Sequence, residues 1–144
     1  MDKITLLAAV VSLIAAVSIP SLSMSQHSHW QAPAKEASRE NPVPADKASL
    51  ARGKKLYRAH CAACHGEQGR GDGPAGTNLE PRPTDLSHVA GHHKDGDLAW
   101  KIAAGRGAMP GWKGVLKEDQ IWDVVNYLKS LYSPGSHGTH GEHH

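Results

Sequence analysis

The feature that most restricts the fold of this 144-residue chain is the segment Cys61-Ala62-Ala63-Cys64-His65, which holds both of its cysteines. Two cysteines three positions apart on one helical turn can each form a thioether with a vinyl group of a haem. The histidine that follows then falls beneath the iron, where its imidazole nitrogen can bind as an axial ligand. The segment therefore predicts covalent attachment of one c-type haem through Cys61, Cys64 and His65.

Other uses of such a cysteine pair fit this sequence less well. A four-ligand zinc site needs a second pair of cysteines, which the chain lacks. Pairing the two cysteines with His88 and His92 leaves a gap far longer than a zinc-finger spacing. A thioredoxin-like redox pair stays open as an alternative, but it does not require the adjacent histidine and normally lies between a strand and a helix.

A candidate for the second axial ligand is Met109, within the run Gly-Arg-Gly-Ala-Met-Pro-Gly-Trp at residues 105–112. A thioether sulfur is a soft ligand that favours ferrous iron and raises the reduction potential of a histidine-ligated haem. The glycines let the backbone pass close to the haem, and Pro110 fixes the chain just after the ligand. The two other methionines lie in the N-terminal apolar segment, so Met109 is the candidate within the rest of the chain.

Two alternatives to this ligand stay open. Met109 could be a core side chain, which is how most methionines are used. His88, His92 or His93 could instead take the sixth position and give bis-histidine iron of lower potential. The polar, glycine-rich surroundings of these histidines are more typical of a solvated loop.

The spacing of apolar residues predicts three helices around these segments. An amphipathic helix is expected over residues 47–60 and a second one over about 95–103. A third is expected over residues 118–131, with Asp119 rather than Lys117 as the capping side chain. The glycine- and proline-rich stretch between the first two helices predicts a long loop, which wrapping the edge of a haem would explain.

In this order, the motifs resemble those of a class I cytochrome c of the short bacterial type. The resemblance extends to small soluble cytochromes and to the haem domains of respiratory oxidase subunits, and covers about residues 49–132. The segments that carry it are Gly53-x-x-x-Tyr57-x-x-x-Cys61, Cys-Ala-Ala-Cys-His-Gly at 61–66, Gly-Asp-Gly-Pro at 71–74, Gly-Ala-Met-Pro-Gly-Trp at 107–112 and Val-Asn-Tyr-Leu at 125–128.

This resemblance implies an all-α cytochrome c fold, with three to four main helices and long loops wrapped around one covalent haem. It implies that the first and last helices cross, with Gly53 and Tyr57 against Tyr127 and Leu128. It also implies that the carbonyl of Pro74 accepts a hydrogen bond from the second imidazole nitrogen of His65, which would fix the orientation of the ring.

Composition divides the chain into four parts. Residues 1–25 contain an apolar run, which predicts an export signal peptide or a membrane anchor formed by residues 4–24. Residues 26–48 carry prolines and mixed charge and predict a linker, residues 49–132 form the expected cytochrome c domain, and residues 133–144 are a histidine-rich tail. Either interpretation of the N-terminus places the domain in the periplasm or elsewhere outside the cytoplasm, soluble after cleavage of the signal or anchored to the membrane.

The function that these features predict is single-electron transfer. With both axial positions of the iron filled there is no open site for a substrate, which argues against an enzyme acting alone. The expected partners are redox proteins that donate and accept the electron, including a membrane oxidase or dehydrogenase of which the chain could be a subunit. The net charge of +2 without a basic stripe gives no indication of nucleic-acid binding.

Two further functions stay open at this stage. The tail histidines His137, His140, His143 and His144 could bind copper, nickel or zinc, which would make the chain a metal-handling protein. A peroxidase-like haem enzyme would require Met109 to leave the iron.

Overall fold

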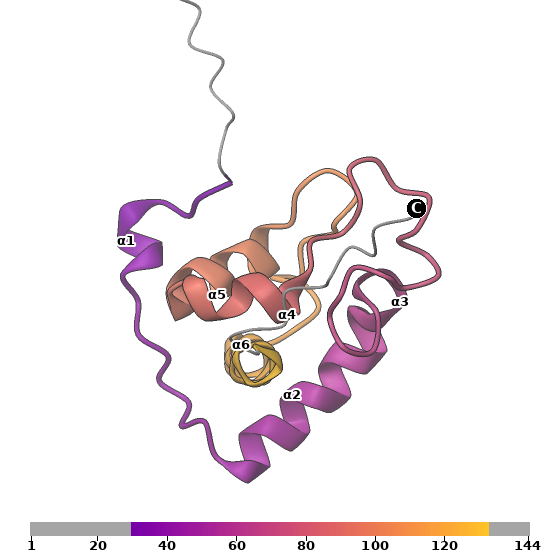
Figure 1. Ribbon diagram of the computed structural model, residues 1–144. Coiled ribbons are helices and arrows are strands. Elements are labelled where there is room, and N and C mark those ends of the chain that lie inside the picture. The colour runs from indigo at the N-terminus through magenta and orange to yellow at the C-terminus, as the bar shows by residue number, and fades with distance from the viewer. Residues whose placement is uncertain (1–29, 133–144) are drawn as a thin grey trace, which may run out of the picture.

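The computed structural model describes residues 30–132, and this range is helical, with one isolated β-bridge in place of any sheet (Figure 1). The predicted all-α fold is therefore confirmed. The elements are α1 (Ala34–Ala37), α2 (Lys47–His60), α3 (Ala62–His65), α4 (Leu86–Val89), the 3₁₀ helix η1 (Ala90–His92), α5 (Asp95–Ala104) and α6 (Glu118–Leu131).

The three longest helices lie where the apolar spacing predicted them, and the start of α6 differs from the expectation. The side-chain oxygen of Gln120 accepts a hydrogen bond from the backbone N–H of Lys117 at 2.9 Å. Asp119 accepts from the N–H of Gln120 at 3.0 Å, so its carboxylate lies within the first turn. Gln120, three residues after the N-cap position, closes this helix end in the manner of a capping box.

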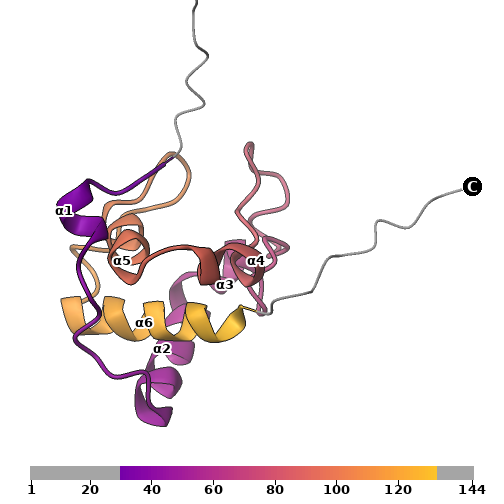
Figure 2. The ribbon, with the colours of Figure 1, turned by 60° about the vertical axis from the view of Figure 1, so that its left-hand side comes forward.

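Helices α2 and α6 cross each other, and Figure 2 shows α6 in front with α2 passing behind it. The crossing is close because Gly53 has no side chain: a β-carbon there would overlap the backbone carbonyl of Asp123 and lie 2.9 Å from Cβ of Tyr127. One turn later the rings of Tyr57 and Tyr127 meet with their centroids 5.3 Å apart. Trp122 and Val125, both fully buried, continue the core along α6.

Replacing Gly53 with alanine is expected to destabilise the protein by about 1–3 kcal/mol, because the added methyl group must push two helix backbones apart. On an open helix surface the same change would stabilise by up to about 1 kcal/mol. Chemical denaturation of the variant should therefore show a lower midpoint. Gly114→Ala is the matched control, since nothing lies within 4 Å of a β-carbon at that position. A raised midpoint for Gly53→Ala would contradict the helix crossing.

A buried polar cluster fixes the same crossing from the side of α2. The carboxylate of Asp123 accepts hydrogen bonds from Ser49 Oγ at 2.7 Å and from Arg52 Nε at 2.7 Å. Burial acts to raise the pKa of Asp123, but the bonds from Arg52 and Ser49 prevail and hold it below its ordinary value. Asn126 adds a bond to Ser49 Oγ at 2.8 Å. Each buried polar group of the cluster named here is thus paired, as buried polar groups must be.

Residues 30–46, which composition assigned to a linker, lie against α5 and α6, and we call this segment the N-terminal strap. The N–H of Ala32 donates to Asp97 Oδ1 at 2.9 Å, and Asn41 Nδ2 donates to Asn126 Oδ1 at 2.8 Å. The guanidinium of Arg39 lies 5.2 Å from the centroid of the Trp122 ring. Polar contacts such as these do not require apolar residues at regular spacing in the sequence. Composition alone therefore predicted a linker.

Both ends of the chain, with the predicted signal or anchor and the histidine-rich tail, lie outside the described residues. Of the helices within residues 30–132, none has both the length and the apolar character needed to cross a membrane.

Candidate functional site

One cleft of about 480 Å³ collects most of the residues that the sequence analysis singled out. Cys61, Cys64 and His65 line it from the junction of α2 and α3, and Met109 lines it from the loop that follows α5. Its volume falls within the range of small-molecule and cofactor sites. The fold thus brings an imidazole, two thiols and a thioether to one cavity from segments more than forty residues apart in sequence.

The cysteine pair is held on a single turn that continues α2 into α3. The N–H of Cys61 donates to the carbonyl of Tyr57 at 2.8 Å, and the N–H of His65 donates to the carbonyl of Cys61 at 2.9 Å. Both thiols are half-buried and unlinked. Because the turn is helical, side chains three and four positions apart share one face, and here that face is the wall of the cleft.

The electrostatic surroundings of Cys61 do not suit a thioredoxin-like redox pair. Burial, with a smaller contribution from the neighbouring Cys64, raises the pKa of the Cys61 thiol to about 12. Redox-active cysteines of that kind have a lowered pKa, because their chemistry depends on the thiolate. The junction also lies between two helices rather than after a strand.

His65 is oriented by a backbone carbonyl. Its Nδ1 lies 3.2 Å from the carbonyl oxygen of Thr84, so Nδ1 is the nitrogen that donates and Nε2 keeps its lone pair. Burial lowers the pKa of His65, and the hydrogen bond that the ring donates to the Thr84 carbonyl opposes this only in part. A neutral imidazole with one nitrogen fixed by a carbonyl is the form in which histidine binds a metal.

Pro74 does not take the role that the resemblance implied. Its carbonyl accepts a hydrogen bond from Thr77 Oγ1 at 3.2 Å, and Thr84 supplies the partner of the His65 ring instead. Pro74 itself is not among the residues that line the cleft. The reason is that the glycine-rich loop folds back on α3, where the N–H of Ala75 donates to the carbonyl of Ala63 at 2.9 Å.

The loop that carries Met109 is a tight reversal of the chain. Arg106 and Met109 form an isolated antiparallel bridge, with N–H to carbonyl distances of 2.9 and 3.0 Å. Gly105 and Gly107 take φ angles of 66° and 58°, which suit glycine. The N–H of Trp112 then donates to the carbonyl of Ile102 at 3.0 Å and ties the loop back to α5. Met109 is therefore presented by a backbone held at both ends.

The histidines that competed with Met109 in the sequence analysis lie elsewhere. None of His88, His92 and His93 lines the cleft. Nδ1 of His93 lies 2.6 Å from the carboxylate of Asp97, and Nε2 of His92 lies 3.4 Å from the hydroxyl of Tyr132. Within the described residues, Met109 and the half-buried His60 are the ligand candidates that share the cavity with His65. The ring of His60 lies against Trp112.

Several residues of the cleft wall were missed by the sequence analysis. Trp30 reaches the cleft from the N-terminal strap, where the guanidinium of Arg106 lies 5.8 Å from its ring centroid. Arg82 lines the cleft from the long loop. A single tryptophan far from the haem-binding motif does not indicate a cofactor site by itself. Arg82 and Arg106, in contrast, lie within or beside the loops predicted to surround the cofactor, and this position could have identified them from the sequence.

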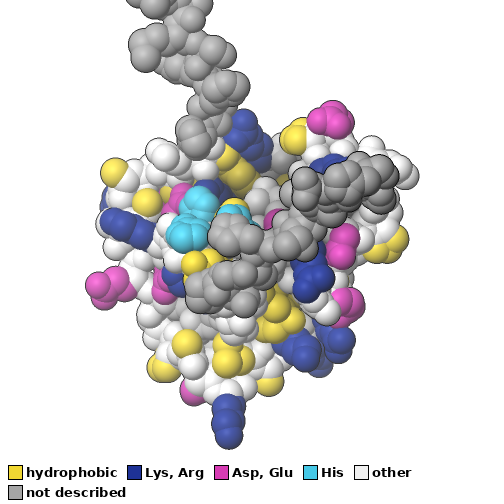
Figure 3. Space-filling view, in the orientation of Figure 1, with side chains coloured by type: hydrophobic (Ala, Val, Ile, Leu, Met, Phe, Trp, Pro, Cys, Tyr) yellow, Lys and Arg dark blue, Asp and Glu magenta, His cyan; other side chains and the backbone are white. Residues whose placement is uncertain are grey.

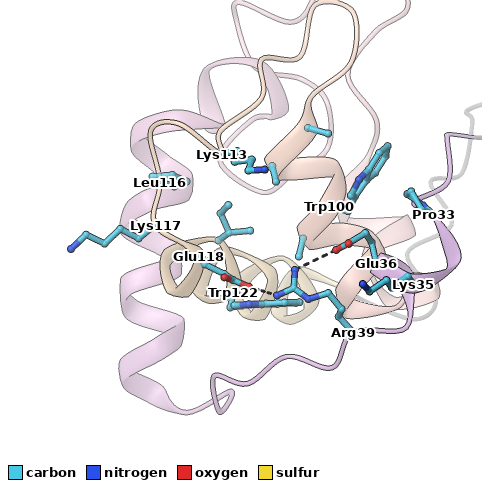
Figure 4. Close-up of a pocket in the computed structure, with 14 residues that line it drawn as sticks. Pro33, Lys35, Glu36, Arg39, Trp100, Lys113, Leu116, Lys117, Glu118 and Trp122 are labelled. Atoms are coloured by element: carbon cyan, nitrogen blue, oxygen red, sulfur yellow. Dashed lines mark hydrogen bonds and ion pairs between the residues drawn. The ribbon is translucent and has the colours of Figure 1, made fainter.

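A larger hollow of about 840 Å³ lies between α1, α5 and α6, and Figure 4 shows its lining residues. Its side chains include Trp100 and Trp122, with Arg39 directed between the carboxylates of Glu36 and Glu118. Among residues 30–132, no cysteine, histidine or methionine lines it. The smaller cleft is therefore the candidate site, because it is the one that holds groups able to bind a cofactor.

Proteins with similar sequences are known for this part of the chain. Residues 48–128 match the family model described as cytochrome c oxidase, cbb3-type, subunit III. The chain is 34% identical over 87 residues to cytochrome c6 of Chlorolobion braunii, an alignment that covers 57% of this chain and 90% of that relative.

Two further proteins are similar to this chain over different shares of their own length. The cbb3-type cytochrome c oxidase subunit FixP of Bradyrhizobium diazoefficiens is 35% identical over 82 residues, which cover 56% of this chain but 27% of FixP. The crystal structure of cytochrome cL from Methylophaga aminisulfidivorans superposes with a TM-score of 0.50 at 22% identity, covering 60% of this chain and 55% of that one. The latter likeness concerns the fold alone.

Proposed function

The chain belongs to the cytochrome c family, and on that premise we propose that it is an extracytoplasmic electron-transfer protein with one covalently bound haem c. His65 and Met109 are the proposed axial ligands, and Cys61 and Cys64 the proposed points of attachment. The observation that carries the proposal is the meeting of these four side chains at one cleft.

The donor set fits a haem. A bound haem c supplies one-electron chemistry at its iron, cycling between the ferrous and ferric states. The two thiols stand one helical turn apart, as attachment to two vinyl groups of one porphyrin requires. His65 offers a neutral imidazole whose orientation is set by Thr84, and Met109 offers a soft sulfur from a loop held at both ends.

Two cationic side chains also suit the cofactor. Arg82 and Arg106 both line the cleft, and a haem carries two propionate groups. Guanidinium groups pair with carboxylates through charge-assisted hydrogen bonds, which are stronger than neutral ones. Arg82 and Arg106 are therefore the side chains that we expect to bind the propionates.

Electron transfer follows from what these ligands do. If His65 and Met109 both held the iron of a bound haem, no position would be left for a substrate, and the haem would supply electron exchange alone. The Met109 loop is held by its own backbone hydrogen bonds, and the ring of His65 is held by the Thr84 carbonyl, so we expect both ligands to keep their places in either oxidation state. Little reorganisation is then needed at each transfer.

The proposal is tested by a redox titration of the purified full-length holoprotein, followed by its absorption spectrum. We expect a single reversible one-electron transition, one haem iron per chain and no binding of carbon monoxide by the ferrous protein. Rapid carbon monoxide binding in the wild-type protein would contradict the closed coordination and favour a peroxidase-like haem enzyme instead.

A second candidate is a subunit of a membrane oxidase or dehydrogenase complex. The specific observation in its favour is the family model, whose description is that of an oxidase subunit. Affinity purification of the tagged chain from gently solubilised cells distinguishes the two functions. Recovery in a stoichiometric complex with haem–copper or dehydrogenase subunits supports the second candidate, and recovery as the chain alone supports the mobile carrier.

A further inference from the structure

On the basis of the proposed function, in which Met109 binds the haem iron, we propose that Trp30 is a positioning residue for this ligand. Its ring, at the start of the N-terminal strap, holds the Met109 loop through Arg106 and thereby keeps the sulfur on the iron. The starting observation is that Trp30 lines the cleft together with Arg106 and Met109, although it lies far from both in sequence. Figure 2 shows the start of the strap beside the loop that follows α5.

The tip of the Met109 loop receives little support from its own residues. Met109 is half-buried, whereas four residues around it are exposed: Arg106, Gly107, Ala108 and Pro110. A β-carbon at Gly107 would meet no atom of the described residues within 4 Å. The backbone bonds between Arg106 and Met109 fix the shape of the loop, but they do not fix its distance from His65. A contact from outside the loop therefore helps to decide where the sulfur lies.

The half-buried ring of Trp30 supplies such a contact. The guanidinium carbon of Arg106 lies 5.8 Å from its centroid, and Nζ of Lys101, on α5, lies 5.7 Å from it. The ring of Trp100, also on α5, meets Trp30 edge to face, with centroids 6.4 Å apart and an interplanar angle of 60°. Cations are attracted to the face of an aromatic ring, and most strongly to that of tryptophan. One side chain of the strap thus joins the Met109 loop to α5.

Trp30 is itself fixed, because the strap is tied to α5 two residues later. The N–H of the buried Ala32 donates to Oδ1 of Asp97 at 2.9 Å, and Nζ of Lys101 donates to Oδ2 at 2.7 Å. Burial acts to raise the pKa of Asp97, but the bonds from Lys101 and Ala32 prevail and hold it below its ordinary value. The anchor of the strap is therefore a charged carboxylate at neutral pH. Figure 3 shows lysine or arginine side chains next to hydrophobic ones near the point where the described residues begin.

Two effects on a bound haem are expected from this arrangement. Met109 can leave the iron only if its loop moves, so a contact that holds the loop favours the bound state. An aromatic ring in the cleft wall also keeps water from the haem, and burial is one of the means by which a protein raises a haem's reduction potential. Loss of the Trp30 ring should therefore increase the fraction of iron without its sulfur ligand and lower the potential.

The test is a titration of ferric full-length holoprotein with imidazole, followed by haem absorption. Imidazole competes with Met109 and binds those molecules in which the sulfur has left, so its apparent affinity reports their fraction. The variants are Trp30→Ala and Trp30→Phe, the second of which keeps an aromatic ring. Asn41→Ala is the matched control, because it removes the hydrogen bond to Asn126 from a part of the strap that does not line the cleft.

We expect Trp30→Ala to bind imidazole at least about tenfold more tightly than the wild-type protein and to have a lower reduction potential. Trp30→Phe should stay within about threefold of the wild type, since it keeps a ring face for Arg106. Asn41→Ala should lower the midpoint of chemical denaturation without changing the imidazole affinity. In an Arg106→Gln background the effect of Trp30→Ala should shrink, because both changes remove the same contact.

Unchanged imidazole affinity in folded Trp30→Ala would overturn this role while leaving the proposed ligands intact. An equal gain in Asn41→Ala would also overturn it, because the cause would then be a looser strap rather than the ring. If the Trp30→Ala protein does not fold, Trp30→Leu replaces it, since leucine keeps apolar bulk but offers no ring face and should give a gain in the same direction. A wild-type spectrum without sulfur ligation would instead overturn the proposed function and this role together.

Discussion

Replacing both Cys61 and Cys64 with alanine is expected to leave almost no holoprotein. The two thioethers are the proposed covalent connection between protein and haem, and without them retention rests on two axial ligands that exchange. The expected result is a loss of more than about nine-tenths of the haem absorption per chain in purified protein. The wild-type protein, in contrast, should keep its haem when it is unfolded in denaturant.

A matched comparison separates attachment from folding. Cys64→Ala alone retains one thioether, so it should give an intermediate yield of holoprotein with haem that still resists extraction. The measurement is haem stain on a denaturing gel together with extraction by acidified organic solvent. Haem that leaves the wild-type chain in the solvent would refute covalent attachment at this pair.

The second large effect is expected at Met109. Alanine at this position removes the thioether but keeps the backbone bonds to Arg106, so the loop should keep its shape while the sixth position of the iron opens. Loss of the soft sulfur ligand should lower the reduction potential and allow carbon monoxide to bind the ferrous iron. The weak near-infrared absorption typical of sulfur bound to ferric haem should disappear at the same time.

Met109→His is the control for this variant. It supplies a ligand again, so carbon monoxide binding should fall back while the potential stays low, since imidazole favours ferrous iron less than a thioether does. A Met109→Ala protein with the wild-type spectrum and potential would show that another side chain binds the iron. His60 would then be the first to examine, because its ring lies at the same cleft.

The long helices could be predicted almost to the residue because their signals are local. The helix over residues 47–60 and the one over residues 118–131 carry apolar stripes that only one helical register satisfies. The close approach at Gly53 was foreseeable too, since a glycine inside a helix otherwise costs stability. The N-terminal strap was not foreseeable, because Asn41 and Ala32 attach it through isolated hydrogen bonds rather than through a periodic apolar face.

The residues of the candidate site also divide into those predicted by local sequence and those placed by the tertiary fold. Cys61, Cys64 and His65 are neighbours in sequence, so their geometry follows from one helical turn. Met109 lies at the same cleft only because of the tertiary fold. The glycines that flank it were the feature of the sequence that indicated a ligand loop. The partner of the His65 ring depends on how a long, non-periodic loop closes. Sequence therefore pointed to Pro74, whereas the structure places the Thr84 carbonyl there.

The strap has a consequence for how far knowledge of relatives can be transferred. Trp30 helps to form the cleft wall, yet the family match begins at residue 48. Two proteins can therefore align throughout the haem-binding motifs and still offer differently shaped rims to a docking protein. Selectivity for a physiological electron donor or acceptor is expected to depend partly on residues 30–46, so recognition has to be mapped on this chain's own surface rather than read from an alignment.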